Sequence, residues 1–108
     1  MAYKILISEP THADIDSTIG YIAVTLAAPN AAASLLDDYE HALTLIADNP
    51  FLFGVDLIVS EALNMQIRRC PVKRYGIYYF VDENIHAVYV VGFAHSLRDT
   101  PSLLEERI

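Results

Sequence analysis

The stretch YIAVTLAAPNAAASLL, residues 21–36, decides the fold of this chain, because one helix ends in it and a second helix starts there. The apolar residues that lead into it recur at spacings of four, three and four positions: Ile15, Ile19, Ile22 and Leu26. This spacing predicts an apolar stripe on one face of a helix. Thr11 followed by Asp14 is a capping-box pattern, so we expect the helix to begin there and Pro29 to end it.

A second helix is predicted directly afterwards, with Asn30 as its cap. Its apolar positions recur at spacings of four, three, four and three: Ala32, Leu36, Tyr39, Leu43 and Ile46. Asn49 before Pro50 stops this helix. Because only a few residues separate the two helices, we expect them to fold back on each other as an antiparallel hairpin that covers an apolar surface.

The surface to be covered is a sheet. Strands are predicted where β-branched and aromatic residues gather or alternate with polar ones: YKILIS at 3–8, ALNMQIRRC at 62–70, YGIYYFV at 75–81 and HAVYVVGF at 86–93. Between the last two strands lies the turn DENI, in which Asn84 can take a positive φ angle. The last three strands therefore form an antiparallel meander.

The predicted order is strand, helix, helix, three strands and a short helix, an α+β class that spans residues 1–108 as a single domain. The helix hairpin packs on one face of an antiparallel sheet (β-α-α-β-β-β). YGIYYFV is apolar on both faces, so the second face is itself partly covered or is a binding surface. In the tail TPSLLEERI, Thr100 is the expected cap of the short helix and Pro101 its first residue.

Composition limits the class of protein. Of the 108 residues, 54% are hydrophobic, which is enough for a core, and the formal net charge is -7. The apolar runs are too short to span a membrane and MAYKILISEP turns polar too soon for a signal peptide, so we expect a soluble cytoplasmic protein without a membrane partner. The single cysteine, Cys70, has no second Cys or nearby His at ligand spacing, so we expect no metal site and no cofactor.

Against this acidic background, RRCPVKR at residues 68–74 holds four of the seven cations, and no acid occurs between Glu61 and Asp82. Residues 1–67 carry a net charge of -8, whereas residues 68–108 carry +1. Affinity for nucleic acid rises with the number of phosphates neutralised, so the overall field of this chain does not draw it onto a polyanion. Any such contact is local and lies in the second half.

The predicted meander can gather these cations at one end of the sheet. The loop after residue 70 lies opposite the DENI turn, and so does the end of the last strand, where AHSLRD follows. The groups expected together at this end are Arg69, Lys73, Arg74, His95 and Arg98. They could cleave RNA, with the histidine as base or acid and the arginines on the phosphate. They could equally bind an acidic protein segment and do no chemistry.

The chain resembles the RelE/ParE superfamily of bacterial type II toxin–antitoxin toxins over about residues 3–99. The resemblance lies in YI in the first helix, P-x-A-A at the start of the second, an arginine strand followed by Y-x-I-x-Y-x-V-D-E, and a closing H-x-x-R-D. It implies a toxin that is neutralised by a co-expressed antitoxin, which wraps it as an extended or helical segment. Members similar to the RelE branch cut messenger RNA on the ribosome, whereas members similar to the ParE branch inhibit DNA gyrase.

The resemblance is closer to the ParE branch. Members of the nuclease branch commonly carry an arginine directly after the tyrosine of the third strand, where this chain has Gly76. They also often have a tyrosine near the C-terminus, but none follows Tyr89 here. Some ribonucleases use a C-terminal histidine instead, which His95 could match. The acidity of the chain also argues against a ribosome binder, since contacts to ribosomal RNA draw on a broadly positive surface.

We therefore expect a growth-arresting toxin of the plasmid-stabilisation type that inhibits DNA gyrase and has a cognate antitoxin. The alternatives are a ribosome-dependent endoribonuclease that acts on messenger RNA, with His95, Arg98 and Arg69 as catalytic residues, and a degenerate toxin fold that only binds a partner. The residues expected to contact target or antitoxin are Arg68, Arg69, Lys73, Arg74, Tyr78, His95 and Arg98. The antitoxin should cover the exposed sheet face and the edge that bears His95, and it could add a strand. A homodimer and a toxin–antitoxin hetero-oligomer both fit this expectation.

Overall fold

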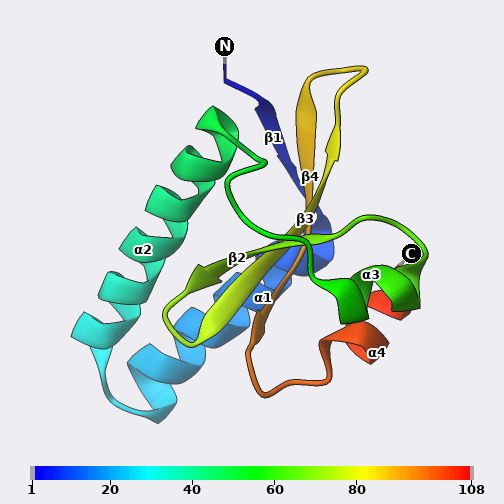
Figure 1. Cartoon of the computed structure of the whole chain (residues 1–108). Helices are drawn as coiled ribbons and strands as arrows, with labels where there is room; N and C mark the ends of the chain where they lie inside the picture. Colours follow the sequence, from blue (N-terminus) through cyan, green and yellow to red (C-terminus); the bar gives the residue numbers. More distant parts are fainter. Residues whose placement is uncertain (1, 108) are drawn as a thin grey trace.

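The computed structural model describes residues 2–107, and its elements follow the predicted succession of a strand, a helix hairpin, three further strands and a short helix (Figure 1). Met1 and Ile108, the ends of the predicted domain and of the TPSLLEERI tail, lie outside the described residues. The elements are β1 (Lys4–Ile7), α1 (Glu9–Gly20), the π-helical turn η1 (Tyr21–Thr25), α2 (Pro29–Asp48), α3 (Leu57–Leu63), β2 (Arg68–Val72), β3 (Tyr75–Asp82), β4 (Ala87–His95) and α4 (Thr100–Glu105).

The strands of the described residues form one sheet in the order β1-β4-β3-β2. The antiparallel meander of β2, β3 and β4 is confirmed, with Arg68 opposite Tyr79 and Tyr75 opposite His95. β1, however, runs parallel to β4, so the sheet is mixed and not antiparallel throughout. A short apolar strand does not encode the direction of its neighbour, which depends on the sheet edge where it docks. The α+β class and the order of the predicted elements are confirmed.

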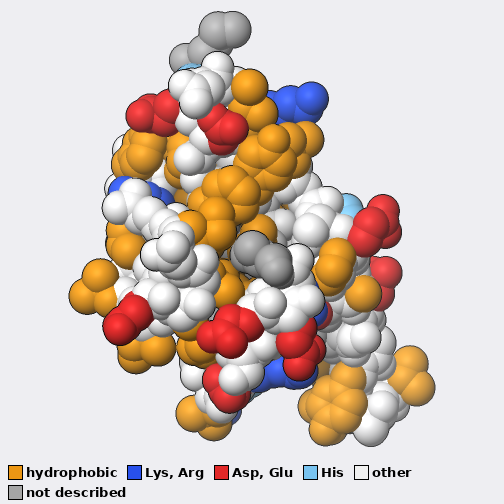
Figure 2. Space-filling view, turned by 90° about the vertical axis from the view of Figure 1, so that its right-hand side faces the viewer, with side chains coloured by type: hydrophobic (Ala, Val, Ile, Leu, Met, Phe, Trp, Pro, Cys, Tyr) orange, Lys and Arg blue, Asp and Glu red, His pale blue; other side chains and the backbone are white. Residues whose placement is uncertain are grey.

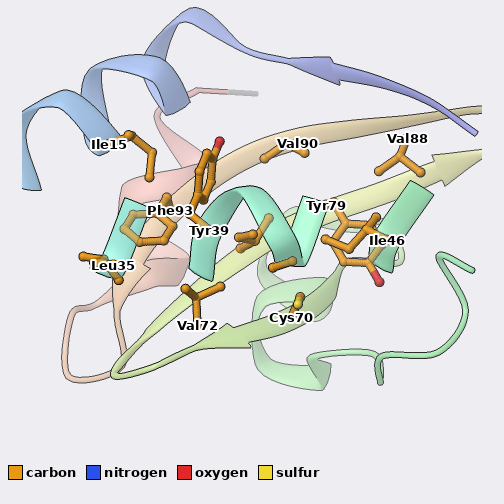
Figure 3. Close-up of a cluster of buried hydrophobic side chains, with 12 residues drawn as sticks. Ile15, Leu35, Tyr39, Ile46, Cys70, Val72, Tyr79, Val88, Val90 and Phe93 are labelled. Atoms are coloured by element: carbon orange, nitrogen blue, oxygen red, sulfur yellow. The ribbon is translucent and has the colours of Figure 1, made fainter. Parts of the chain in front are cut away.

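The hairpin of α1 and α2 covers one face of the sheet, and the main core lies between them (Figures 1 and 3). Its buried side chains include Ile15, Leu35, Tyr39, Ile46, Cys70, Val72, Tyr79, Val88, Val90 and Phe93. The fully buried positions of α2 include Leu35 and Ala42, whereas the predicted Leu36 and Leu43 are partly buried at the margin. A helical spacing of three or four fits either set, and the direction from which the sheet approaches selects between them.

The connection between the two helices differs from the prediction. α1 continues into the π-helical turn, and Leu26, the last member of the predicted stripe, is exposed. Ala27 then turns the chain in a left-handed conformation with φ 51°. Pro29 is the first residue of α2, where its missing N–H would have had no helical partner, so Asn30 lies inside the helix and is not its cap.

Ser8 caps α1 in place of the predicted Thr11: its hydroxyl accepts the Thr11 N–H at 3.2 Å. Thr11 is buried against β4, where its hydroxyl donates to the carbonyl of Val90 at 3.3 Å. Asp14, the other half of the predicted capping box, accepts the N–H of Phe93 at 3.2 Å. Both side chains thus serve the backbone of β4 at the point where β1 ends, a tertiary role that overrides the local pattern.

The predicted strand at 62–70 is wrong in its first half. The segment Leu57–Leu63 is helix α3, capped by the carboxylate of Asp56 and ended by Asn64, which has φ 54°. Alternation over 63–67 covers only three apolar positions, which fit a loop as well as a strand. The capping Asp and the left-handed Asn are the start and stop signals that identify this helix.

The second face of the sheet is partly covered, as one of the two predicted alternatives had it. α3 and α4 pack on it around a smaller core: Val59, Ile67, Tyr78, Ala94 and Leu104. Leu104 lies over Gly92 of β4, where a Cβ would come within 2.6 Å of the leucine side chain. This glycine therefore permits α4 to approach the sheet closely.

Two turns beside β4 also differ in detail. In the turn before it, His86 and not Asn84 takes the left-handed conformation, with φ 52°. After β4, Asp99 caps α4 by accepting a backbone N–H at 3.4 Å. Thr100 is consequently the first residue of that helix and Pro101 the second.

Candidate functional site

The β2–β3 turn and the end of β4 meet at one end of the sheet, as the meander predicts. Tyr75 lies opposite His95, and the N–H of Ser96 donates to the carbonyl of Arg74 at 2.8 Å. This hydrogen bond ties the loop after β4 to the turn that carries Lys73 and Arg74. Lys73 has φ 53°, which is uncommon for a residue with a side chain.

A hollow of about 500 Å³ lies between this end of the sheet and the helix hairpin, and we call it the hairpin groove. Its lining residues are Ile22, Leu26, Ala28, Ala31, Leu35, Lys73, Arg74, Tyr75 and His95. The helix side comes from residues 17–36, a tract that contains no charged residue. The sheet side contributes two cations and an imidazole, so the groove is apolar on one wall and rich in hydrogen-bond donors on the other.

A second, more polar hollow of about 400 Å³ lies on the other side of His95, and we call it the polar cleft. It is lined by Asp14, Ser17, Thr18, Tyr75, Phe93, Ala94, His95, Arg98 and Leu103. Tyr75 and His95 line both hollows and so form the wall between them. The Tyr75 ring stacks on Phe93 at 5.1 Å and meets the His95 ring edge to face at 5.2 Å. Because Phe93 is buried, this wall is fixed to the main core.

The hydrogen bonding of His95 decides which of its nitrogens is available to a ligand. The N–H of Leu97 donates to Nδ1 of His95 at 3.1 Å. A neutral imidazole whose Nδ1 accepts a hydrogen bond carries its proton on Nε2, so the other nitrogen is a donor. In this arrangement His95 can bind a carbonyl or carboxylate, but it lacks the lone pair that a general base must present to its substrate.

Arg69 lies on the opposite face of the sheet from His95. Successive residues of a strand point to opposite faces, and Arg69 is paired with Tyr78, whereas His95 is paired with Tyr75. The guanidinium donates from Nε to the Tyr78 hydroxyl at 3.1 Å and from Nη2 to the Tyr75 carbonyl at 3.3 Å. A Cβ on Gly76 would come within 2.5 Å of Nε, so Arg69 fills the space that a side chain at position 76 would occupy.

Two more of the expected cations are engaged within the chain. Arg68, at the end of β2 away from the turn, donates to the carbonyl of Phe53 at 2.7 Å and lies over the ring of Phe51, 5.0 Å from its centroid. Lys73 forms an ion pair with Asp38 of α2 at 3.0 Å. These contacts hold the 51–53 loop and the β2–β3 turn against their neighbours.

The structure thus brings some of the expected site residues together and separates others. Lys73, Arg74 and His95 line the hairpin groove, and Arg98 joins His95 in the polar cleft. Arg68 and Arg69 lie elsewhere, as described above. Tyr78 is only 4% exposed, so it offers a partner almost no surface, and its hydroxyl instead receives the hydrogen bond of Arg69.

The helix wall of the groove and its ion pair were missed by reasoning from the sequence. Leu35 lies one position from Leu36 of the predicted stripe, and Asp38 is not part of any motif recognised in the sequence. A signal was nevertheless present: the uncharged tract of residues 17–36 interrupts a strongly acidic half of the chain. Such a tract at a helix hairpin tip is typical of a contact surface.

The described residues contain no reactive thiol. Cys70 is buried, and this burial raises the pKa of its thiol to about 11, so it stays protonated at neutral pH. Within residues 2–107 no group of three or more His, Cys, Asp and Glu side chains could hold a metal ion. No helix of that part of the chain is long and apolar enough to cross a membrane.

Comparison with known families gives a match over residues 5–100 to the ParE toxin of type II toxin–antitoxin system. The match runs through the helix hairpin and all the strands that form the groove and the cleft. The chain belongs to this family. The resemblance to the RelE/ParE superfamily, with its closer likeness to ParE, is confirmed. This ParE-family chain is the toxin of a type II toxin–antitoxin system.

The fold of this ParE-family chain is also similar to a solved structure. A chain of the toxin–antitoxin complex RelBE2 from Mycobacterium tuberculosis superimposes with a TM-score of 0.60, and the alignment covers 88% of this chain and 99% of that one. The two sequences are 16% identical, so the likeness establishes the fold alone. Among proteins with curated functions, no significant match to the chain was found.

Proposed function

We propose that this ParE-family toxin arrests growth by binding a protein target, DNA gyrase, and that its antitoxin holds it inactive in the cytoplasm. The observation that carries the proposal is the separation of the groups that an RNA-cleaving site would need. A ribonuclease must bring a base, an acid and cations to one phosphate. Here Arg69 and His95 lie on opposite faces of the sheet, and Nδ1 of His95 is occupied by a backbone N–H.

Gly76 adds to this argument. At this position the nuclease branch commonly carries an arginine, and the space is filled here by the guanidinium of Arg69. That guanidinium is held by Tyr78 and by a backbone carbonyl. It therefore faces the α3 and α4 side of the sheet, away from the groove and from His95.

The surface of the molecule fits a protein target better than an RNA. On the face shown in Figure 2, Lys and Arg side chains form small, separate areas among acidic and hydrophobic ones. The formal net charge of -7 does not attract ribosomal RNA. The hairpin groove offers instead an apolar wall and a few donors, which is the usual composition of the central part of a protein interface.

The antitoxin is the partner that the family match and the RelBE2 complex support. Addition of an antitoxin strand at the β2 edge is disfavoured. The outward N–H of Arg69 already donates to the carbonyl of Gly54 at 3.1 Å, and Pro71, which faces the same way, has no N–H. An edge strand with few free backbone N–H groups pairs poorly with a further strand. An antitoxin segment that lies in the hairpin groove suits the molecule better.

Two assays with the purified chain test the proposal. In one, gyrase supercoils relaxed plasmid in the presence of the toxin, and in the other, ribosomes translate a labelled messenger RNA. We expect inhibition of supercoiling and an intact messenger, and addition of the antitoxin should restore supercoiling. Messenger cleavage that requires ribosomes and is lost in His95→Ala would refute the proposal in favour of the ribonuclease. Normal growth of bacteria that express the folded chain alone would refute both and support the degenerate, partner-binding fold.

A further inference from the structure

The Lys73–Asp38 ion pair separates two hollows that lie along the same helix. One is the hairpin groove. The other, of about 220 Å³, is lined by Asp38, His41, Ala42, Leu45, Phe53, Cys70, Pro71, Val72 and Lys73. Lys73 lines both, and its Nζ reaches Asp38 of α2 at 3.0 Å. The ion pair therefore connects the β2–β3 turn to α2 at the place where the two hollows share Lys73.

We propose that the hairpin groove binds an acidic, amphipathic segment of the antitoxin, and that Lys73 then exchanges Asp38 for a carboxylate of that segment. The identity of the partner rests on the function proposed above. The exchange itself is inferred from the groove and the ion pair.

The chemistry of the groove selects such a segment. Its helix wall is apolar, and the apolar side of an amphipathic segment can cover it. Its sheet wall presents the ammonium of Lys73, the guanidinium of Arg74 and the Nε2 donor of His95. No acidic side chain of the described residues lines this groove. Because the rest of the chain is strongly acidic, an acidic segment is repelled elsewhere and directed to this place.

The ion pair is suited to exchange because it is weak. The side chains of Lys73 and Asp38 are 47% and 50% exposed, and exposed pairs of this kind contribute little to stability. Breaking it leaves two charges that water can solvate. The turn around Lys73 is closed by the pairing of Val72 with Tyr75, so only the lysine side chain has to move. Asp38 therefore competes with the partner for Lys73 and lowers its affinity.

A double-mutant cycle on the affinity of the toxin for its antitoxin tests the exchange. The variants are Asp38→Asn, Lys73→Gln and the double variant, with Asp37→Asn as a matched control at the neighbouring exposed acid of α2. The cognate antitoxin is labelled with a fluorophore and titrated with each purified toxin. Far-ultraviolet circular dichroism and thermal unfolding establish that every variant is folded.

Removing the competitor should strengthen binding. We expect Asp38→Asn to tighten it by about two- to fivefold, the range that loss of an exposed ion pair corresponds to. Lys73→Gln should weaken binding by about tenfold, in line with the loss of an interfacial charge pair. In the Lys73→Gln background Asp38→Asn should have no effect, because its influence acts through Lys73. Asp37→Asn should change the affinity by less than about twofold.

Several outcomes would overturn the exchange. Weaker binding of Asp38→Asn would show that Asp38 holds Lys73 in place for the partner. If Asp38→Asn changed the affinity equally in the wild type and in the Lys73→Gln variant, the effect of Asp38 would be long-range charge repulsion and not competition for Lys73. If Asp38→Asn instead increased self-association in light scattering, the groove would belong to a second copy of the chain. If the wild-type toxin binds its antitoxin but none of the substitutions changes the affinity, the exchange is overturned and the proposed function stands. If the wild-type toxin neither arrests growth nor binds any antitoxin, the proposed function itself is overturned.

Discussion

Arg69 and Gly76 are neighbours on β2 and β3 whose side chains fit together. The guanidinium lies where a Cβ at position 76 would be, 2.5 Å from Nε, and it is held there by Tyr78 and by the carbonyl of Tyr75. In the sequence, Gly76 stands where members of the nuclease branch commonly have an arginine. In the structure the same space contains an arginine from the adjacent strand, which points toward the other helix layer.

The Arg69 guanidinium also lies over the Tyr78 ring, 5.8 Å from its centroid. Gly76→Ala should therefore lower the free energy of unfolding by about 1 kcal/mol, because the new methyl group displaces the guanidinium from its hydrogen bonds and from this ring. In the Arg69→Ala background the same substitution should raise it by about 0.5 kcal/mol, since alanine is better than glycine in a strand. Urea denaturation of the four proteins measures both values. A similar loss in the two backgrounds would place the clash elsewhere than at Arg69.

Two side chains attach α4 to the sheet: the buried Leu104 and Arg107, which follows the helix. Arg107 forms two hydrogen bonds to the carboxylate of Asp14, both at 2.7 Å, and a third to the carbonyl of Val91 at 3.2 Å. The hydrogen bonds to Asp14 raise the pKa of the guanidinium above its ordinary value. A helix as short as Thr100–Glu105 is not stable alone. Its attachment to α1 and β4 therefore comes from this contact and from Leu104.

Arg107→Ala should reduce the free energy of unfolding by about 2 kcal/mol, because both partners are largely shielded from water and Asp14 loses a charged donor. In the Arg107→Ala variant, the amides of α4 should also exchange with deuterium faster than those of the α1–α2 hairpin. Arg98→Ala is the matched control: this arginine is exposed in the loop before α4, and its loss should change stability by less than about 0.5 kcal/mol. Unchanged exchange in α4 after Arg107→Ala would mean that the apolar contacts of the smaller core hold the helix without Arg107.

The molecule as a whole buries ionisable groups that are stable only in their neutral forms. Burial in the main core raises the pKa of Tyr39 to about 12 and that of Cys70 to about 11. It also raises the pKa of Tyr79, whose hydroxyl donates to the carbonyl of Pro50 at 2.7 Å. The ordinary values are 10.0 for a tyrosine and 9.0 for a cysteine. Unfolding therefore releases protons at alkaline pH.

The contribution of these groups to the free energy of unfolding should accordingly be constant below pH 9 and fall as the pH rises toward 12, since each raised group stabilises the fold below its unfolded pKa and loses that effect as the pH passes its folded pKa. Cys70 loses its contribution between pH 9 and about 11. Cys70→Ala should flatten the curve in that interval, although it lowers stability at pH 7 through the cavity it leaves. Urea denaturation at a series of pH values measures this. Parallel curves for the two proteins would show that the thiol does not ionise on unfolding.

The sequence by itself determined the elements and most of their order. Spacings of three and four, the proline at position 29 and the aromatic runs act within a few residues of the chain, so the helix hairpin and the meander could be predicted without tertiary information. The gathering of Lys73, Arg74 and His95 at one sheet end followed from the same meander. α3 was not predicted although its capping residues are present, because the alternation of apolar and polar residues over 63–67 also fits a strand.

Only the tertiary structure decided which of these side chains share a surface. A shift of one residue in strand register moves a side chain to the opposite face, so the separation of Arg69 from His95 depends on pairings that no local pattern encodes. The parallel docking of β1 and the Lys73–Asp38 ion pair likewise join segments far apart in the chain. Local periodicity specifies which element each segment forms, whereas strand register and packing specify which side chains that element faces.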